Sequence, residues 1–141
     1  MTFNDLPENW PTLPLTDPAH VADVLDVFVD LQARASGSLL LLLCDDLRRP
    51  IQPILIDSID ERRPHRARGF LTRLADTLAG SEAVSSALCA IARRDGLQAT
   101  KYDRRWRREL EEAFEGRVEL LGVHLVTFDG SVPIGAVDEA A

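Results

Sequence analysis

Two stretches of this chain are almost entirely apolar, and amphipathic segments lie around them. Leu39–Cys44 is apolar throughout, and 85–92 is apolar apart from two serines at its start. Continuous apolarity, rather than alternation with polar residues, is typical of strands that are covered on both faces of a sheet. We therefore expect these stretches to form buried central strands.

Other strands are predicted at less buried positions. The segment 51–59 follows the first buried strand after a short turn, so the two should form an antiparallel hairpin. Pro53 has no N–H to donate to a neighbouring strand, so it should lie at an edge of the sheet, at a bulge or at the start of its strand. The segment 118–128 is also largely apolar, and an Asp-Gly pair should turn it into a short last strand at 132–134.

Amphipathic helices are predicted between these strands. The first should run from about 18 to 34, because Asp17 is a good N-cap and apolar residues then recur at helical spacing. The second should place Phe70 on its apolar side and end at Gly80. The third, at 100–115, is rich in charged residues.

The predicted elements follow the order α, β, β, α, β, α, β, β. A hairpin combined with helical crossovers indicates a layered α/β (α+β) fold with a mixed, mainly antiparallel sheet flanked by helices. A length of 141 residues suits one domain. We expect an extended, proline-rich arm at 1–16, the domain at 17–135 and a flexible tail at 136–141.

Composition narrows the compartment and the cofactors. Apolar residues make up 45% of the chain, but no run approaches the roughly 18 residues needed to cross a membrane. The N-terminal residues do not resemble a secretory signal, so we expect a cytoplasmic protein without a membrane partner. Cys44 and Cys89 lie in apolar runs without C-x-x-C spacing, which favours buried, inert thiols. No cofactor is predicted.

The net charge of −7 conceals a basic middle. Residues 1–30 carry −6 and residues 109–141 carry −7, whereas 31–108 carry +6. This block indicates either internal charge pairing or a surface for an anionic partner. The anion-binding candidates are Arg93, Arg94, Lys101, Arg104, Arg105 and Arg108, with Arg107 among them in sequence. Four more arginines could extend this surface: Arg62, Arg63, Arg66 and Arg68.

The helix at 100–115 should turn one acidic residue inward. At about 100° per residue, Asp103 falls on the arc of the apolar residues, and we expect it to be the only acidic residue there. With Thr100 as N-cap, Asp103 fits a variant of the capping box, and the alternative is a functional carboxylate. Ion pairs at i, i+4 spacing should offset part of the charge. They are Arg105–Glu109, Arg107–Glu111 and Arg108–Glu112.

A family resemblance is carried by the segment from 89 to 134, CAIARRDGLQATKYDRRWRRELEEAFEGRVELLGVHLVTFDGSVPI. It resembles the C-terminal half of JAB/MPN domains, especially the RadC-type branch. There a strand ends in His-x-His, a loop leads to Ser-x-x-Asp at a helix start, and a strand with an Asp-Gly turn follows. Two histidines and the aspartate bind zinc, the serine helps to hold the oxyanion, and a glutamate is the general base. By this resemblance Thr100 matches the serine and Asp103 the aspartate.

The histidine pair has no counterpart in this chain. By strict spacing its places fall on Ala90 and Ala92; with one loop residue deleted they fall on Ile91 and Arg93. A catalytic zinc needs three protein ligands, and Asp103 alone is not enough. The resemblance therefore implies a degenerate JAB/MPN domain, and we predict no catalytic zinc and no peptidase activity.

The three histidines of the chain form no metal motif. His124 should share its strand face with Leu120 and Val126, so a core or subcore imidazole is favoured over a metal ligand. His65 lies in a charged loop, and His20 lies in the first turn of the first helix. No metal site is predicted.

Three functional interpretations follow. The leading one is a non-catalytic interaction or scaffold domain that binds a protein partner or a second copy of itself. The second is a nucleic-acid-associated accessory protein that uses the basic segment Arg93–Arg108, an interpretation that rests partly on analogy. The third is a hydrolase with a rebuilt site, whose candidate catalytic residues are Thr100, Asp103 and Arg93. The sequence has no Gly-rich phosphate loop and no nucleophile elbow to favour an enzyme.

Overall fold

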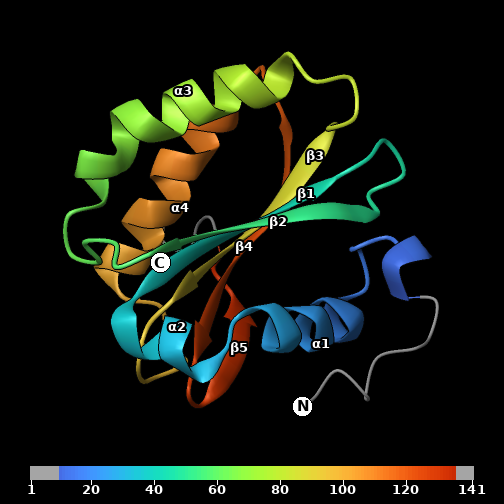
Figure 1. Cartoon of the computed structure of the whole chain (residues 1–141). Helices are drawn as coiled ribbons and strands as arrows, with labels where there is room; N and C mark the ends of the chain where they lie inside the picture. Colours follow the sequence, from blue (N-terminus) through green and yellow to red (C-terminus); the bar gives the residue numbers. More distant parts are fainter. Residues whose placement is uncertain (1–9, 136–141) are drawn as a thin grey trace.

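Five strands form one sheet in the computed structural model, which describes residues 10–135 (Figure 1). They are β1 (Ser38–Cys44), β2 (Pro50–Asp57), β3 (Ser86–Ala92), β4 (Glu119–Thr127) and β5 (Gly130–Pro133). Their order in the sheet is β2-β1-β3-β4-β5. Only β3 and β4 are parallel, because α4 (Lys101–Phe114) crosses between them; the other described neighbours are antiparallel.

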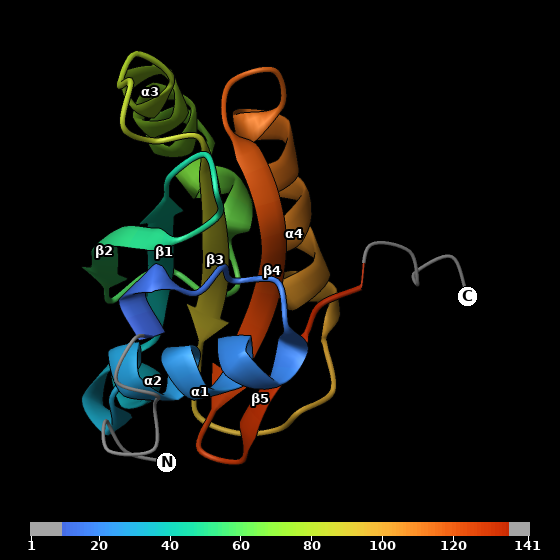
Figure 2. The same cartoon turned by 90° about the vertical axis from the view of Figure 1, so that its right-hand side faces the viewer.

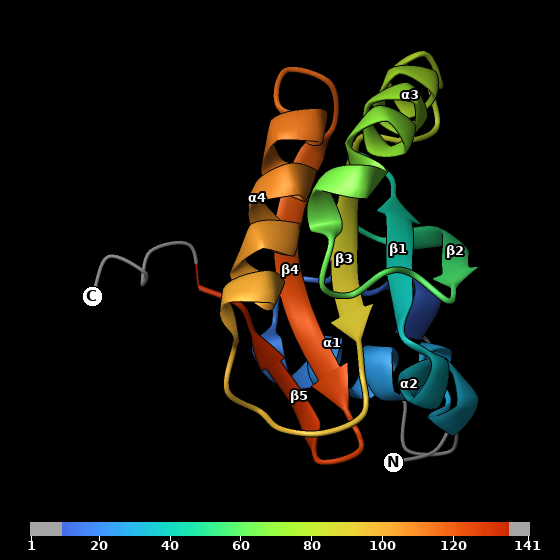
Figure 3. The same cartoon turned by 90° about the vertical axis from the view of Figure 1, so that its left-hand side faces the viewer.

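Helices cover both faces of the sheet. The helices α3 (Arg68–Ala79) and α4 lie over one face, and α1 (Pro18–Phe28) and α2 (Leu31–Ser36) lie across the other (Figures 2 and 3). Short 3-10 turns occupy Trp10–Thr12 and Pro64–Ala67. The predicted fold class is therefore confirmed, and the predicted order of elements differs only in its first helix.

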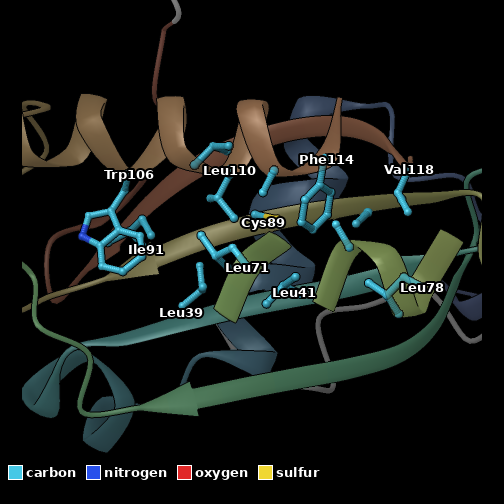
Figure 4. Packing of buried hydrophobic residues seen from close by; sticks show 14 of the residues in the cluster. Leu39, Leu41, Leu71, Leu78, Cys89, Ile91, Trp106, Leu110, Phe114 and Val118 are labelled. Atoms are coloured by element: carbon cyan, nitrogen blue, oxygen red, sulfur yellow. The ribbon is translucent and has the colours of Figure 1, made fainter. Parts of the chain in front are cut away.

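The two central strands supply both cores. Every residue of β1 and β3 is buried, as their continuous apolarity predicts. Alternate side chains point to opposite faces, so Leu41 packs beneath α3 and α4 whereas Leu40 packs against α1. Figure 4 shows the first of these cores, to which α4 contributes Trp106, Leu110 and Phe114.

The prediction of a single helix at 18–34 is wrong, because the first helix ends at Phe28. Val29 has an extended backbone (φ −111°, ψ 91°), and Asp30 caps α2 by accepting a 2.8 Å hydrogen bond from the N–H of Ala33. An aspartate side chain that caps a following helix disfavours continuation of the preceding helix. It does so here although the apolar residues keep their helical spacing across the break. The break buries Arg34, which donates to the Val29 carbonyl at 2.9 Å.

One residue of the apolar side predicted for α3 differs, whereas Leu71 and Leu78 are buried as predicted. Phe70 is 42% exposed, whereas Leu71, Ala75 and Leu78 are buried. The helix packs against α4, and at about 100° per residue Phe70 lies beside the arc formed by the buried residues. Gly80 is the C-cap residue, as predicted.

A β-bulge in β4 changes which residues share a face. Ala87 pairs with Leu120 but Leu88 pairs with Gly122, so Leu121 is an extra residue. Leu120 therefore packs toward the core under α3 and α4, and His124 lies on the opposite face with Val126. The prediction that His124 shares a face with Leu120 is wrong, because a bulge reverses the alternation.

The strand β2 lies at the edge of the sheet with β1 as its neighbour, which confirms one of the positions predicted for Pro53. The side-chain amide of Gln52 donates to the Pro53 carbonyl at 3.2 Å. Three apolar side chains of β2 are exposed: Ile51, Pro53 and Leu55. Pro53 and Leu55 share a face, and Ile51 is the extra residue of a β-bulge. We refer to these three residues as the β2 strip.

The predicted arm and tail lie partly or wholly beyond the described residues. Positions 1–9 of the arm and the whole tail at 136–141 are outside them. In the described part of the arm, the Trp10 ring meets Phe28 edge-on at 5.7 Å, and Leu15 is buried. No helix between residues 10 and 135 is long and apolar enough to span a membrane.

Candidate functional site

A pocket of about 340 Å³ opens where β3 ends and α4 begins. Its lining residues are Glu61, Arg62, Arg93, Arg94, Asp95, Thr100, Tyr102 and Asp103. In parallel α/β sheets ligands commonly bind at the carboxyl ends of the strands, and this pocket lies at the carboxyl end of β3, which is parallel to β4. The fold thus brings all three candidate catalytic residues into one pocket.

Thr100 and Asp103 form the capping box that their spacing predicts. The Asp103 N–H donates to the Thr100 hydroxyl oxygen at 3.2 Å, and the Thr100 N–H donates to the Asp103 carboxylate at 2.8 Å. Two of the free N–H groups at the start of α4 are satisfied in this way. Asp103 is 2% exposed, so this carboxylate is also the inward-facing one that was predicted.

Arg93 neutralises the buried Asp103 carboxylate. Its Nε lies 3.2 Å and 3.3 Å from the two carboxylate oxygens, and its Nη2 lies 2.9 Å from one of them. The other arginine donors bond the carbonyls of Gln98 and Asp95. A guanidinium forks well onto a carboxylate, and this pair also ties the loop after β3 to the first turn of α4.

The bonding of Arg93 and Asp103 limits what the pocket can do chemically. Both Asp103 oxygens accept hydrogen bonds from a cation, and every Arg93 nitrogen donates within the chain. A carboxylate paired in this way is a poor general base and a poor metal ligand. The described lining contains no imidazole and no thiol.

Glu61 is a lining residue that the sequence does not single out. With Arg62 it follows β2, about 30 to 40 residues before the other lining residues in sequence, and its backbone carbonyl accepts from the Trp106 indole at 3.1 Å. Burial raises the pKa of its carboxyl group, an effect that Arg93 partly offsets. An added Cβ at Gly37 would displace the end of this side chain, and the φ of 81° at Gly37 favours glycine.

No group of three or more His, Cys, Asp and Glu side chains within residues 10–135 is arranged to hold a metal ion. Neither the Ala90 and Ala92 pair nor the Ile91 and Arg93 pair brings an imidazole to Asp103. The zinc prediction itself stays untested. His124 lies elsewhere, and its pKa is lowered to about 4, mainly because it is removed from water.

Both cysteines are buried and free, as expected. Removal from water raises the pKa of Cys44 to about 11 and also raises the pKa of Cys89. A thiol of raised pKa is a weak nucleophile at neutral pH. Neither side chain therefore offers chemistry to the pocket.

The anion-binding candidates do not form one surface. Arg93 is committed to Asp103, and the Arg94 guanidinium lies 5.8 Å from the centre of the Phe128 ring. The remaining candidates are exposed on α4: Lys101, Arg104, Arg105 and Arg108. With Arg107, Glu111 and Gly135 they line a hollow of about 260 Å³.

The four upstream arginines are divided among several partners. Arg62 lies over the Tyr102 ring at 5.9 Å, and Arg68 donates to Glu109. The other two are about 4 Å from Asp60: Arg63 at 3.9 Å and Arg66 at 3.8 Å. They do not form a continuous extension of the basic residues of α4.

Glu109 is a second acidic residue that points inward, so the expectation that Asp103 is the only one is wrong. Glu109 is 2% exposed and accepts from Arg68 at 2.8 Å and 3.0 Å. Contact between α3 and α4 buries a flank of α4 that a one-sided helix would expose. The pair Arg105–Glu109 is therefore not formed; of the three predicted pairs, the described salt bridges include Arg107–Glu111 alone.

Comparison with known proteins finds no family model that matches the chain and no matching curated protein. The resemblance to JAB/MPN domains stays a prediction.

Proposed function

We propose that this protein is a non-catalytic interaction module, which binds another protein rather than transforming a substrate. The observation that carries the proposal is the pairing of Arg93 with Asp103 at the centre of the pocket. This pairing uses the groups that an enzyme would keep free for a substrate, a proton or a metal ion.

The β2 strip supplies a surface for the partner. Ile51 is 44% exposed and Leu55 is 40% exposed, and nearby Leu31 at the start of α2 is 67% exposed. The strand has no charged residue before Asp57. Apolar side chains gathered at a sheet edge favour contact with an uncharged, apolar protein surface.

The proposal is tested by comparing two sets of substitutions in the native cells. Ile51→Glu with Leu55→Glu places charges on the β2 strip, and Arg62→Ala with Arg94→Ala removes charges from the pocket rim. We expect the first pair to reduce cross-linked partner recovery at least tenfold, and the second pair to leave it unchanged, with both proteins folded by circular dichroism.

The opposite result supports the enzyme interpretation. If the β2 variant keeps its partner and its cellular phenotype while Glu61→Gln abolishes the phenotype, then the pocket is the working site and the proposal fails.

We place the protein in the cytoplasm, where free thiols such as Cys44 and Cys89 remain reduced.

A further inference from the structure

The outer face of α4 divides into a basic half and an acidic half. Seven positions at helical spacing form this face, and none is buried. They are, in order, Lys101, Arg104, Arg105, Arg108, Glu111, Glu112 and Glu115. At about 100° per residue they fall within an arc of about 120°. All basic residues come first and all acidic residues follow, so the face has opposite charge at its two ends.

This order of charges is unfavourable for an isolated helix. Cations near a helix N-terminus and anions near its C-terminus oppose the helix dipole. Little within the helix offsets this unfavourable order. Among residues 10–135, Arg107–Glu111 at 2.9 Å is the one salt bridge that joins two residues of α4. Five side chains of the face make no hydrogen bond or salt bridge to a described residue, although Lys101 lies over the Tyr102 ring: Lys101, Arg105, Arg108, Glu112 and Glu115.

A second copy of α4 in the antiparallel direction complements both halves at once. With a two-fold axis near Arg108, the two copies of Arg108 lie beside each other at the axis, and the other basic residues of each helix lie opposite the acidic residues of the other. Lys101 then faces Glu115, and Arg104 faces Glu112, in both directions across the axis. The two helix dipoles are also antiparallel, which is favourable. The faces are about 21 Å long at 1.5 Å per residue.

A nucleic acid accounts for only half of this face. Phosphates would be attracted to Arg104, Arg105 and Arg108 but repelled by the acidic half that follows directly on the same face. An acidic peptide meets the same obstacle. We infer that the outer face of α4 is a self-association surface, through which two copies of this chain pair with their α4 helices antiparallel.

The position of α4 in the fold allows this contact. Figure 3 shows α4 beside α3 at one side of the helical layer. The β2 strip lies on the edge strand β2. The helix α4 connects β3 with β4, which are separated from β2 by β1. The inference therefore goes beyond the proposed function, and either can fail without the other.

Two charge-reversal variants test the inference. Arg104→Glu with Arg105→Glu makes the face mainly acidic, and Glu112→Arg with Glu115→Arg makes it mainly basic. In sedimentation velocity at low salt we expect wild type to associate and each variant alone to be monomeric. An equimolar mixture of the two variants should associate again, because an acidic face then meets a basic face.

Salt and a matched control complete the experiment. Exposed ion pairs are screened, so wild-type association should weaken on the order of tenfold or more at high salt. Arg66→Glu with Arg73→Glu changes the net charge by the same amount as Arg104→Glu with Arg105→Glu. Neither residue belongs to the outer face of α4, so this variant should associate like wild type.

Two results would overturn the inference. One is a monomeric wild type at low salt and high protein concentration; the other is a mixture of the variants that does not associate. If the wild type stays monomeric but retards a nucleic acid, and the Arg104→Glu, Arg105→Glu variant does not, the basic half is a nucleic-acid surface instead.

Discussion

Each buried charged side chain between residues 10 and 135 has a defined partner. Asp103 is paired with Arg93, Glu109 with Arg68, and Arg34 with Asp26. Burial without a partner is costly for a charge, so these positions are more sensitive than surface ion pairs. Asp103 carries the additional role of capping α4.

A double-mutant cycle should measure this pairing. We expect Asp103→Ala to lower the free energy of unfolding by about 3 kcal/mol, because it removes the carboxylate that accepts from the Thr100 N–H and that neutralises Arg93. Arg93→Ala should cost less, since the Asp103 carboxylate still accepts a hydrogen bond from the Thr100 N–H. Urea unfolding of both single variants and the double variant should give a coupling energy of about 1–3 kcal/mol. A coupling near zero would mean that the pair contributes nothing and that Arg93 is free for another role.

At the scale of elements, local spacing predicts the fold better than it predicts the site. The strands and the capping box follow from neighbouring residues, and the structure confirms them. The break at Asp30 was missed because apolar residues keep their helical period across it. Glu61 and the Arg68–Glu109 pair were missed because their neighbours are distant in sequence and meet only after the sheet and its helices have assembled.

The break between α1 and α2 should depend on its cap. Asp30→Ala removes the hydrogen bond to the Ala33 N–H, and we expect a loss of about 1 kcal/mol in the free energy of unfolding. Asp46→Ala is a suitable control, because Asp46 is exposed and lies in a turn outside any helix. An equal effect of both substitutions on the urea midpoint would show that the cap does not specify the break.

The whole molecule should lose stability toward acid in two steps. The pKa of His124 is lowered from 6.5 to about 4 in the folded state, so the unfolded chain binds more protons between these values. Stability is therefore complete above about pH 6.5 and falls as the pH approaches 4. Below that range the carboxyl groups with lowered pKa, Asp26 and Glu109 among them, add a second loss as they are protonated.

His124→Gln should remove the first step alone. The pKa difference corresponds to roughly 2–3 kcal/mol, so the free energy of unfolding of wild type should drop by about that amount between pH 7 and pH 4.5. The variant should change much less over this range, while its loss at lower pH should match that of wild type. Parallel pH profiles of the two proteins would exclude His124 as the cause.

The proline in the middle of β2 limits how this molecule meets its neighbours. An apolar edge strand with unpaired backbone N–H and C=O groups would otherwise allow strands of other molecules to pair with it repeatedly, as in fibrils. Pro53 offers no N–H to such a newcomer, and the Gln52 amide already occupies its carbonyl. The edge of the sheet can therefore expose apolar side chains without offering the backbone hydrogen bonds at Pro53 that a further strand would need.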